Sequence, residues 1–431
     1  MNRKLSDCED LFNITKLKKE NFDGSATTIY FSENESENLT LFEIPKKFVG
    51  YIFSCEEGSF DIRFSKDNLK SYLVNDNETY ELTEIETSNS VFLIDNFDYS
   101  NKENVVKLNK IGIQAKSSSH IECNIVKMPK VYDCKDLLSQ TQLTSELEAP
   151  TVSITKKCLL KNLPCSETEC LICLRKLRAV LFNAEVRLCS ASLQSRILDE
   201  IFNFCDINKC DWKKGIPMEN AIKDVSTIFP REVIEQLISV YFFKDKSDPN
   251  VIHPQIKRTS QIYGEHLLET VSSKFALEDF LKLWKSTLPE GMDLKLDYLI
   301  SEGRAVCYPT TDKPKDVYKN PESFCIELLR SEDLPDSSEE ERINNLFSIK
   351  SEWEENQLAG FLADLVNDNQ IEMKKKFNKA IEDDILYFSD EENEPNYSII
   401  KPSISTIITK FCKYNIYEKP RKLFLKHQKF F

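Results

Sequence analysis

The chain has 431 residues, which is enough for two to four domains at the usual ~100–200 residues each. Its 57 Lys and Arg against 71 Asp and Glu give a net charge of −14, which excludes a uniformly basic surface for nucleic acid and confines any DNA contact to a local patch. None of the nine Gly is followed by Lys, and neither Gly-x-Gly-x-x-Gly nor Gly-x-Ser-x-Gly occurs. These absences exclude a Walker-type phosphate loop, the dinucleotide fingerprint and the hydrolase nucleophile elbow.

The N-terminal residues lack the apolar core of a signal peptide, and no apolar run approaches the ~18 residues of a membrane span. We therefore expect a soluble intracellular chain that has no membrane partner. In that compartment the 14 Cys are expected to be reduced thiols, most of them acting as small apolar residues.

Residues 1–132 are predicted to form a β domain. Short runs rich in Val, Ile, Tyr, Phe and Thr recur about every ten residues, and several alternate apolar with polar residues. Such spacing is typical of a barrel or a sandwich, so we expect an antiparallel, barrel-like domain whose edge strands are covered by a partner chain. The expected strands are 27–31, 39–44, 49–54, 59–64, 70–74, 79–83, 90–95, 110–115 and 120–126.

Residues 133–157 are polar and rich in Ser and Thr, which indicates a linker with room for a short helix. A helical period follows. Ser166-x-x-Glu169 has the spacing of a capping box. After this motif in the sequence, five apolar residues at helical spacing form one stripe: Cys170, Cys173, Leu174, Leu177 and Leu181.

The rest of the chain mixes helices with a strand or two, and the overall prediction is an α+β multidomain protein. The expected helices are 194–205, 218–228, 230–243, 259–272, 276–288, 294–301, 340–353 and 355–366, and the expected strands are 186–190, 305–309 and 323–329. Blocks of this kind are typical of tandem winged-helix domains, although periodicity does not separate a wing from another hairpin. We place the three domains at 158–195, 196–273 and 274–431.

The end of the chain divides sharply in charge. Residues 382–394 hold seven acids and no base, which predicts a solvated loop. Residues 401–431 hold eight cations against Glu418, so they carry +7 and the rest of the chain carries −21. Cations interleaved with aromatics are typical of nucleic-acid contact. The candidate DNA-binding residues here are Lys410, Lys413, Lys419, Arg421, Lys422, Lys426 and Lys429.

Two interpretations of this basic end stay open. Residues 404–417 are also expected to be the last helix and strand of a winged domain, in which case only 419–431 is a free basic end. A second basic patch also has two interpretations, DNA contact and an ordinary solvated helix face, and the solvated face is favoured. Its residues are Arg175, Lys176, Arg178 and Arg187.

One group of cysteines has metal-like spacing: Cys158, Cys165, Cys170 and Cys173. Zinc needs four ligands, but no second close Cys pair and no His is near, so we predict core thiols and no metal. The four His are scattered, and nothing in their spacing indicates a catalytic or zinc-protease site. We therefore expect no cofactor and no catalytic residues.

Further motifs resemble a known family, the sister chromatid cohesion protein Dcc family. They share an order and spacing along the chain, and their residues are Thr79, Tyr80, Leu82, Thr87, Ser88, Asn89, Trp284, Pro289, Glu290, Gly291, Asp333, Leu334, Pro335, Arg342, Leu346, Phe347, Trp353, Asp364 and Leu365. Residues 409–422 are similar to the family's closing segment. The chain departs from the pattern at Ile343, Glu352 and Gly360-Phe361.

The resemblance implies a non-catalytic subunit of the chromosome-transmission-fidelity clamp loader, an alternative replication factor C complex. Its N-terminal β domain would join the large and small partner subunits in a triple-barrel module, and three winged-helix domains would follow. The implied partners are the replication factor C small subunits, the sliding clamp, DNA polymerase epsilon and DNA without sequence specificity. The implied setting is the nucleus, in DNA replication and sister chromatid cohesion during the cell cycle.

The alternative function is that of a winged-helix scaffold in a ubiquitin ligase or a transcription complex, because winged helices also serve there.

Overall fold

The structure is a computed structural model that describes residues 16, 28–31, 39–46, 48, 60–65, 69–75, 78–94, 110–126, 131–144, 152–271, 273–310, 316–366, 402–414 and 422–426. Contacts divide the chain into two units. Unit 1 comprises residues 1–56 and 81–124, and unit 2 comprises residues 57–80 and 125–431. The expected strand 49–54 and the acidic segment 382–394 lie outside the described residues.

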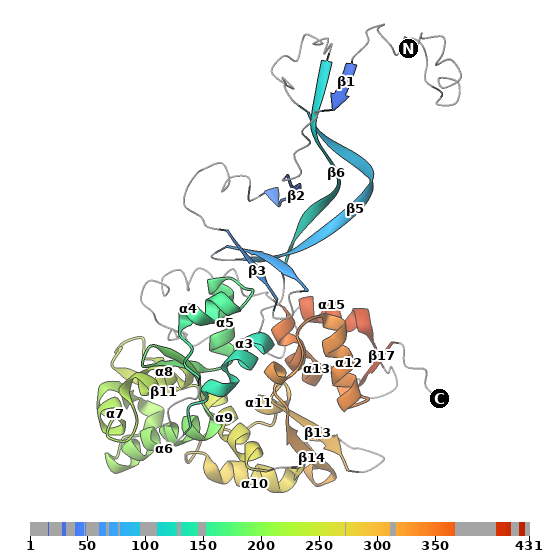
Figure 1. Cartoon of the computed structure of the whole chain (residues 1–431). Coiled ribbons are helices and arrows are strands. Elements are labelled where there is room, and N and C mark those ends of the chain that lie inside the picture. Colours follow the sequence, from blue (N-terminus) through green and yellow to red (C-terminus); the bar gives the residue numbers. More distant parts are fainter. Residues whose placement is uncertain are drawn as a thin grey trace. The chain divides into compact units, whose positions relative to one another are not determined.

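The described strands of unit 1 form an open sheet (Figure 1). They are β1 (Thr28–Phe31), β2 (Phe42–Glu43) and most of β5 (Thr79–Ile94) and β6 (Lys110–Ile125). β6 neighbours β5 and pairs in parallel with β1 and β2. The prediction of an antiparallel barrel is therefore wrong for these strands, because β1 and β2 run parallel to β6 and no described pairing closes the sheet.

Two of the expected strand pairs are each one long strand. β5 covers both 79–83 and 90–94, and β6 covers both 110–115 and 120–125. Residues 79–94 contain neither Gly nor Pro, and the turn-favouring Ser88, Asn89 and Ser90 lie within the continuous strand β5.

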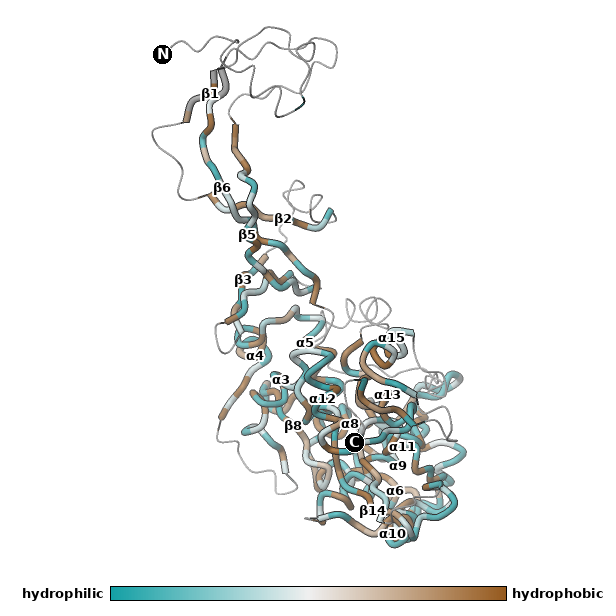
Figure 2. Tube along the Cα trace, turned by 90° about the vertical axis from the view of Figure 1, so that its right-hand side faces the viewer, coloured by the Kyte–Doolittle hydropathy of each residue, from teal (hydrophilic) through white to brown (hydrophobic). Residues whose placement is uncertain are grey.

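The unit 1 sheet exposes apolar side chains that a finished domain would bury. The end of β5 is apolar at four consecutive positions, which Figure 2 shows in its hydropathy colours. The side chains of unit 1 that are exposed by more than a third are Ile29, Phe31, Leu39, Leu41, Phe42, Val91, Phe92, Leu93 and Ile94. Where exposed apolar side chains form a contiguous patch, that patch typically marks a site of protein association.

Unit 2 begins with an antiparallel hairpin of β3 (Asp61–Phe64) and β4 (Ser71–Val74). Arg63 fixes this hairpin onto α4 (Lys156–Asn162). Its Nη1 donates to the carbonyl oxygens of Leu160 at 2.7 Å and Cys165 at 2.7 Å. Carbonyl groups at the end of a helix lack partners within the helix, so a guanidinium group stabilises them.

The predicted capping box is confirmed at α5 (Glu167–Lys176). The Ser166 hydroxyl accepts from the Glu169 N–H at 3.1 Å, and the Glu169 carboxylate accepts from the Ser166 N–H at 3.0 Å. Thr79, where β5 begins, donates its hydroxyl to the same carboxylate at 2.5 Å. The sequence motif therefore starts the helix and also holds the first residue of β5.

The segment predicted as a linker with room for a short helix packs into the core over the first of its described residues. It contains most of α3 (Val131–Leu138), whose Cys134 and Leu138 side chains are fully buried. An antiparallel hairpin of β7 (Ala179–Phe182) and β8 (Glu185–Leu188) follows α5.

The remaining described elements of unit 2 form three repeats of one topology, helix–strand–helix–helix–strand–strand, with the third strand always in the middle of the sheet. The repeats appear in green, yellow and orange-red in Figure 1. The first repeat is α6 (Ala191–Ile207), β9 (Ile216–Pro217), α7 (Met218–Val225), α8 (Arg231–Tyr241), β10 (Phe242–Lys244) and β11 (Val251–Pro254). The second repeat is α9 (Ile256–Glu269), β12 (Phe275–Ala276), α10 (Leu277–Thr287), α11 (Asp297–Ile300), β13 (Ala305–Pro309) and β14 (Phe324–Leu328). The third repeat is α12 (Glu339–Ile349), β15 (Trp353–Glu354), α13 (Glu355–Leu362), α15 (Pro402–Phe411), β16 (Cys412–Tyr414) and β17 (Lys422–Leu425).

Two buried clusters hold these elements together. One core extends from Val131 to Ile326 and contains Trp284, whose Nε1 donates to the Ser260 carbonyl at 2.9 Å. The other belongs mainly to the third repeat and contains Trp353, whose Nε1 donates to the Lys350 carbonyl at 2.9 Å. Burying a Trp requires a partner for its N–H, and both tryptophans have one.

The second and third repeats meet backbone to backbone at Gly360 on α13. A Cβ at Gly360 would lie 2.4 Å from the Ser301 carbonyl oxygen and 2.7 Å from the Gly303 nitrogen. Gly303 itself has a φ of +64°, which an L side chain rarely adopts. Only glycine at position 360 permits this approach.

Replacing Gly360 with alanine is expected to lower the free energy of unfolding by about 1–3 kcal/mol, because the added methyl group meets backbone atoms that cannot rotate away. Urea denaturation monitored by tryptophan fluorescence measures the change. Asn356→Ala, at an exposed position of the same helix, is the control and should stay within about 0.5 kcal/mol of the parent. An equally small effect at Gly360 would contradict the close approach.

Candidate functional site

The basic residues of the C-terminal end divide between the third repeat and segments that are not described. Lys410 lies on α15, Lys413 on β16, Lys422 on β17, and Lys426 directly after β17. The other candidates, Lys419, Arg421 and Lys429, lie outside the described residues.

Three of these four lysines have partners within the repeat. Lys410 pairs with Glu339 at 2.9 Å, and Lys422 pairs with Glu352 at 2.8 Å. The Lys426 ammonium donates to the Thr409 carbonyl at 2.7 Å. Lys413 is exposed and makes no ion pair with any residue that the structure describes.

The solvent face of α15 carries hydroxyl groups and a lysine. Ile404, Ile407 and Ile408 are buried on the opposite face, while Thr406 and Lys410 are exposed. α15 contains no acid. Hydroxyl and ammonium groups both contact phosphate in nucleic-acid complexes. Here the Thr406 and Thr409 hydroxyls donate to the Pro402 and Ser405 carbonyls, and Lys410 pairs with Glu339.

The equivalent helices of the other repeats offer no such face. On α8, Glu232 and Glu235 are exposed, and Gln236 forms two hydrogen bonds of 2.7 Å with the backbone N–H and carbonyl of Leu181. The β7–β8 hairpin therefore covers part of α8. The second repeat has only the short α11 at this place, with Leu299 and Ile300 buried.

The second basic patch is used largely inside the fold. Lys176 pairs with Asp364 of the third repeat at 2.9 Å. Burial alone raises the pKa of the Asp364 carboxyl, but Lys176 and the hydrogen bonds outweigh it and lower that pKa to about 2. Arg187 is 2% exposed and donates to the Thr141 carbonyl at 3.1 Å, and Arg175 is half-buried.

Arg178 belongs to a buried ionic cluster centred on Glu265 of α9. Its Nη2 lies 2.9 Å from Glu265, Arg330 Nε lies 3.0 Å away, and Arg304 Nε lies 3.8 Å away. Burial raises the pKa of the Glu265 carboxyl, but the three guanidinium groups outweigh it and lower the pKa to about 2. The cluster joins the segment after α5 to the second repeat and to the connection between the second and third repeats.

Most of the cysteines that have metal-like spacing are buried in the core. Cys165, Cys170 and Cys173 are buried thiols, as predicted, whereas Cys158 is exposed. Burial raises the pKa of Cys173 well above its usual value, which keeps the thiol neutral and unreactive. The absence of a metal stays a prediction.

Among the described residues, one group has side-chain ligands close enough for a metal ion. His120 Nε2 lies 3.5 Å from a Glu43 oxygen and 3.7 Å from a Glu122 oxygen. A histidine between two surface carboxylates is also an ordinary polar contact, so this group does not argue for a metal.

Sequence patterns did not reveal the role of Arg63 or of the Glu265 cluster. Arg63 contacts carbonyl groups about 100 residues away, and Arg178 contacts Glu265 across 87 positions. The one sequence signal was the position of the capping box, which marks where the chain enters α5. Among the described residues, no helix has the length and apolar character needed to cross a membrane.

Known proteins match most of this chain. The family model described as "Sister chromatid cohesion protein Dcc1" matches residues 39–362. A zebrafish (Danio rerio) protein named "Sister chromatid cohesion protein DCC1" is 23% identical over 380 residues, covering 85% of this chain and 92% of its own length. The human (Homo sapiens) protein of that name is 26% identical over 329 residues, covering 73% and 79% respectively.

A Dictyostelium discoideum relative extends the match beyond vertebrates. It is named "Probable sister chromatid cohesion protein DCC1" and is 22% identical over 320 residues, covering 68% of this chain and 78% of its own length. The family match spans three quarters of the chain, from β2 to the end of α13, and includes the first two repeats and the buried Trp284 and Trp353. The chain therefore belongs to the Dcc1 family of sister chromatid cohesion proteins.

Proposed function

We propose that this chain is a non-catalytic subunit of an alternative sliding-clamp loader in the nucleus, where it acts in DNA replication and sister chromatid cohesion. Its family membership supports the cohesion role. The observation that carries the proposal further is the threefold repeat of helix–strand–helix–helix–strand–strand, which is the order of a winged helix. Such modules bind DNA and proteins and need no catalytic residues.

The proposed winged-helix modules are residues 191–254, 256–328 and 339–425. These bounds differ from the sequence-based 158–195, 196–273 and 274–431, because each sheet is completed by the two strands that follow its third helix. The segment 156–188 then becomes a separate element of helices α4 and α5 with the β7–β8 hairpin.

The unit 1 sheet is the proposed attachment site for the large and small partner subunits of the loader. Its exposed apolar side chains need a cover, and its described strands leave the sheet open. Partner strands that complete this sheet would cover the apolar side chains and also close the sheet. The replication factor C small subunits, the sliding clamp and DNA polymerase epsilon would then be brought together by the assembled loader.

Co-expression with the two partner subunits is expected to protect the unit 1 sheet. Backbone amides of residues 81–94 and 110–124 should exchange hydrogen more slowly in the complex than in the full chain alone, while those of α6 should not change. Hydrogen exchange with mass spectrometry measures both. Stable co-purification with a ubiquitin ligase or a transcription complex, without replication factor C small subunits, would instead support the alternative scaffold function.

DNA contact is proposed for the third module. Lys413 follows α15 and is exposed and unpaired among the described residues, while Lys410 on α15 is exposed but pairs with Glu339 of α12 at 2.9 Å. Phosphate contacts without base contacts are expected, because a clamp loader acts wherever a primer ends. Arg178 and Arg187 are not part of this proposed surface, since both are buried.

Replacing Lys410 and Lys413 together with alanine is expected to weaken binding to unrelated duplexes equally, by roughly tenfold. If both lysines neutralise phosphates, the slope of log affinity against log salt should fall by about 1.8. Fluorescence anisotropy over a salt series measures both quantities. The double variant Lys209→Ala and Lys223→Ala removes the same charge from exposed positions of the first repeat and is the control. Equal effects of the two variants would show that only net charge matters.

A further inference from the structure

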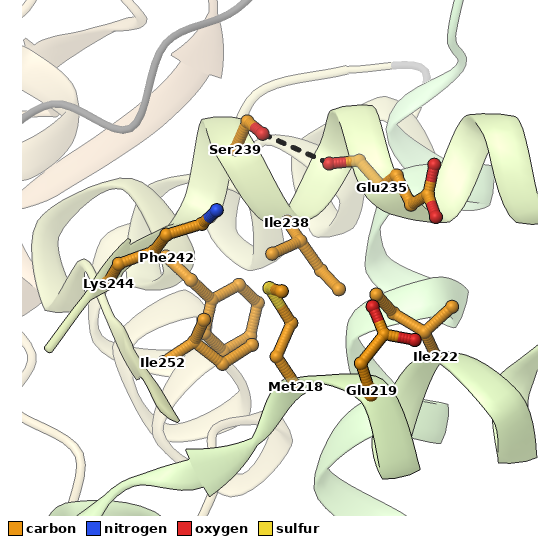
Figure 3. Close-up of a pocket in the computed structure, with 9 residues that line it drawn as sticks. All are labelled: Met218, Glu219, Ile222, Glu235, Ile238, Ser239, Phe242, Lys244 and Ile252. Carbon is orange, nitrogen blue, oxygen red and sulfur yellow. Dashed lines mark hydrogen bonds between the residues drawn. The ribbon is translucent and has the colours of Figure 1, made fainter. Parts of the chain in front are cut away.

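The first repeat contains an apolar groove that the proposed DNA and subunit contacts do not use. It lies between α7, α8 and the strands β10 and β11, and its volume is about 190 Å³. Figure 3 shows Met218 in the middle, between Ile222 on one side and Phe242 and Ile252 on the other. An apolar cavity of ~150 Å³ holds a benzene molecule, so this groove has room for one large apolar side chain.

The floor of the groove is preformed. Ile222, Ile238, Phe242 and Ile252 are each at most 4% exposed, and they come from four different elements of the first core, α7, α8, β10 and β11. Their positions are fixed by packing on the inside of the repeat. A preformed floor of this kind binds a side chain without the cost of ordering its own residues.

The charged side chains at the rim of the groove indicate which charge a bound ligand would carry. Arg231 holds both carboxylates of the rim, with its Nε 2.6 Å from Glu235 and its Nη2 3.0 Å from Glu219. Lys244 is exposed, and its ammonium group makes no ion pair or hydrogen bond with any residue that the structure describes. Lys244 and Phe242 are two residues apart on β10, so both side chains point to the same face.

We propose that this groove docks an acidic peptide segment of a partner protein. One bulky aliphatic or aromatic side chain of the segment enters the groove, and a neighbouring Asp or Glu pairs with Lys244. A nucleic acid is disfavoured, because the floor of the groove is apolar. The inference does not depend on the clamp-loader proposal, since it rests on the groove and its charges alone.

Selection of short random peptides by the full-length protein tests the proposal. The selected peptides are expected to share a bulky apolar residue with an acid close to it. Synthetic copies should bind the parent protein, and an alanine in place of the apolar residue should abolish binding. Selection of no peptides, or of peptides without an acid, would overturn the proposal.

Three variants locate the peptide site. Ser239→Trp fills the groove from its rim, and Lys244→Glu reverses the unpaired charge; each should reduce affinity for the acidic peptide by at least about tenfold. Lys244→Glu should also gain binding to a copy of the peptide with Lys in place of its acid, which a misfolded variant would not do. Lys223→Glu, an exposed change of the same charge outside the groove, should leave both affinities unchanged.

Two results would contradict the assignment of the groove. Peptide binding that survives both Ser239→Trp and Lys244→Glu would place the peptide elsewhere. Loss of duplex DNA binding in Lys244→Glu but not in Lys223→Glu, with peptide affinity unchanged, would identify the rim as a nucleic-acid contact instead.

Discussion

Replacing Arg342 with lysine is expected to lower the free energy of unfolding by about 3–5 kcal/mol, the largest effect of any single change considered. Arg342 is 1% exposed and donates to four backbone carbonyls, those of Pro335 at 2.7 Å, Ser331 at 2.9 Å, Phe361 at 3.0 Å and Leu334 at 3.0 Å. A lysine ammonium cannot reach four acceptors that a planar guanidinium group bridges, so buried carbonyls would lose their partners.

Urea denaturation of the full chain, followed by Trp353 fluorescence in a Trp212→Phe and Trp284→Phe background, reports on the third repeat. Arg231→Lys is the matched control, because Arg231 is 52% exposed and its ion pairs are on the surface. The control should stay within about 0.5 kcal/mol of the parent. A midpoint for Arg342→Lys that matches that of Arg231→Lys would contradict the structural role of the four carbonyl contacts.

Replacing Glu265 with glutamine is expected to cost about 3 kcal/mol at pH 7. The change removes the shared carboxylate from Arg178, Arg304 and Arg330 and leaves their buried charges with weaker compensation. Shape and volume are nearly unchanged, so the loss reports charge rather than packing. Glu340→Gln, at an exposed position on α12, removes one charge that has no partner among the described residues, and it should have little effect.

The cost at Glu265 is also expected to depend on pH. The pKa of its carboxyl is about 2 in the folded chain, below the ~4.3 of an unfolded glutamate. Its stabilising contribution is therefore complete above about pH 5 and is lost as the pH falls through 4 toward 2. The difference in unfolding free energy between the parent and Glu265→Gln should shrink over that range. A difference that stays constant from pH 7 to pH 3 would show that the charge is not what the cluster requires.

Local features of the chain were predictable because they depend on neighbours in the sequence. The capping box at Ser166 and Glu169 formed as its spacing indicated, and the strand at 305–309 was predicted to the residue. The helix predicted at 276–288 is α10 at 277–287. Periodicity and capping determine such elements because their hydrogen bonds join residues a few positions apart.

Pairing between distant strands was beyond the reach of these patterns. The long β5 and β6 and the parallel partners of β6 make an open sheet, whereas evenly spaced short runs had indicated a closed barrel. The bounds of the repeats shifted for the same reason, since β14 and β17 close sheets begun about 50 and 70 residues earlier. Which strands pair depends on contacts that a local pattern does not contain.

The sequence by itself determined the class of this protein, its succession of helices and strands, the uneven distribution of its charge and its likeness to one family. Only the tertiary structure decided what each charge does. Lys176, Arg178 and Arg187 form part of one basic patch in the sequence, yet their partners are Asp364, Glu265 and the Thr141 carbonyl. Those partners lie 188, 87 and 46 positions away. Burial raises the cost of an unpaired charge, so the fold brings distant partners to these three cations and leaves Lys413 and Lys244 exposed, where an outside partner can reach them.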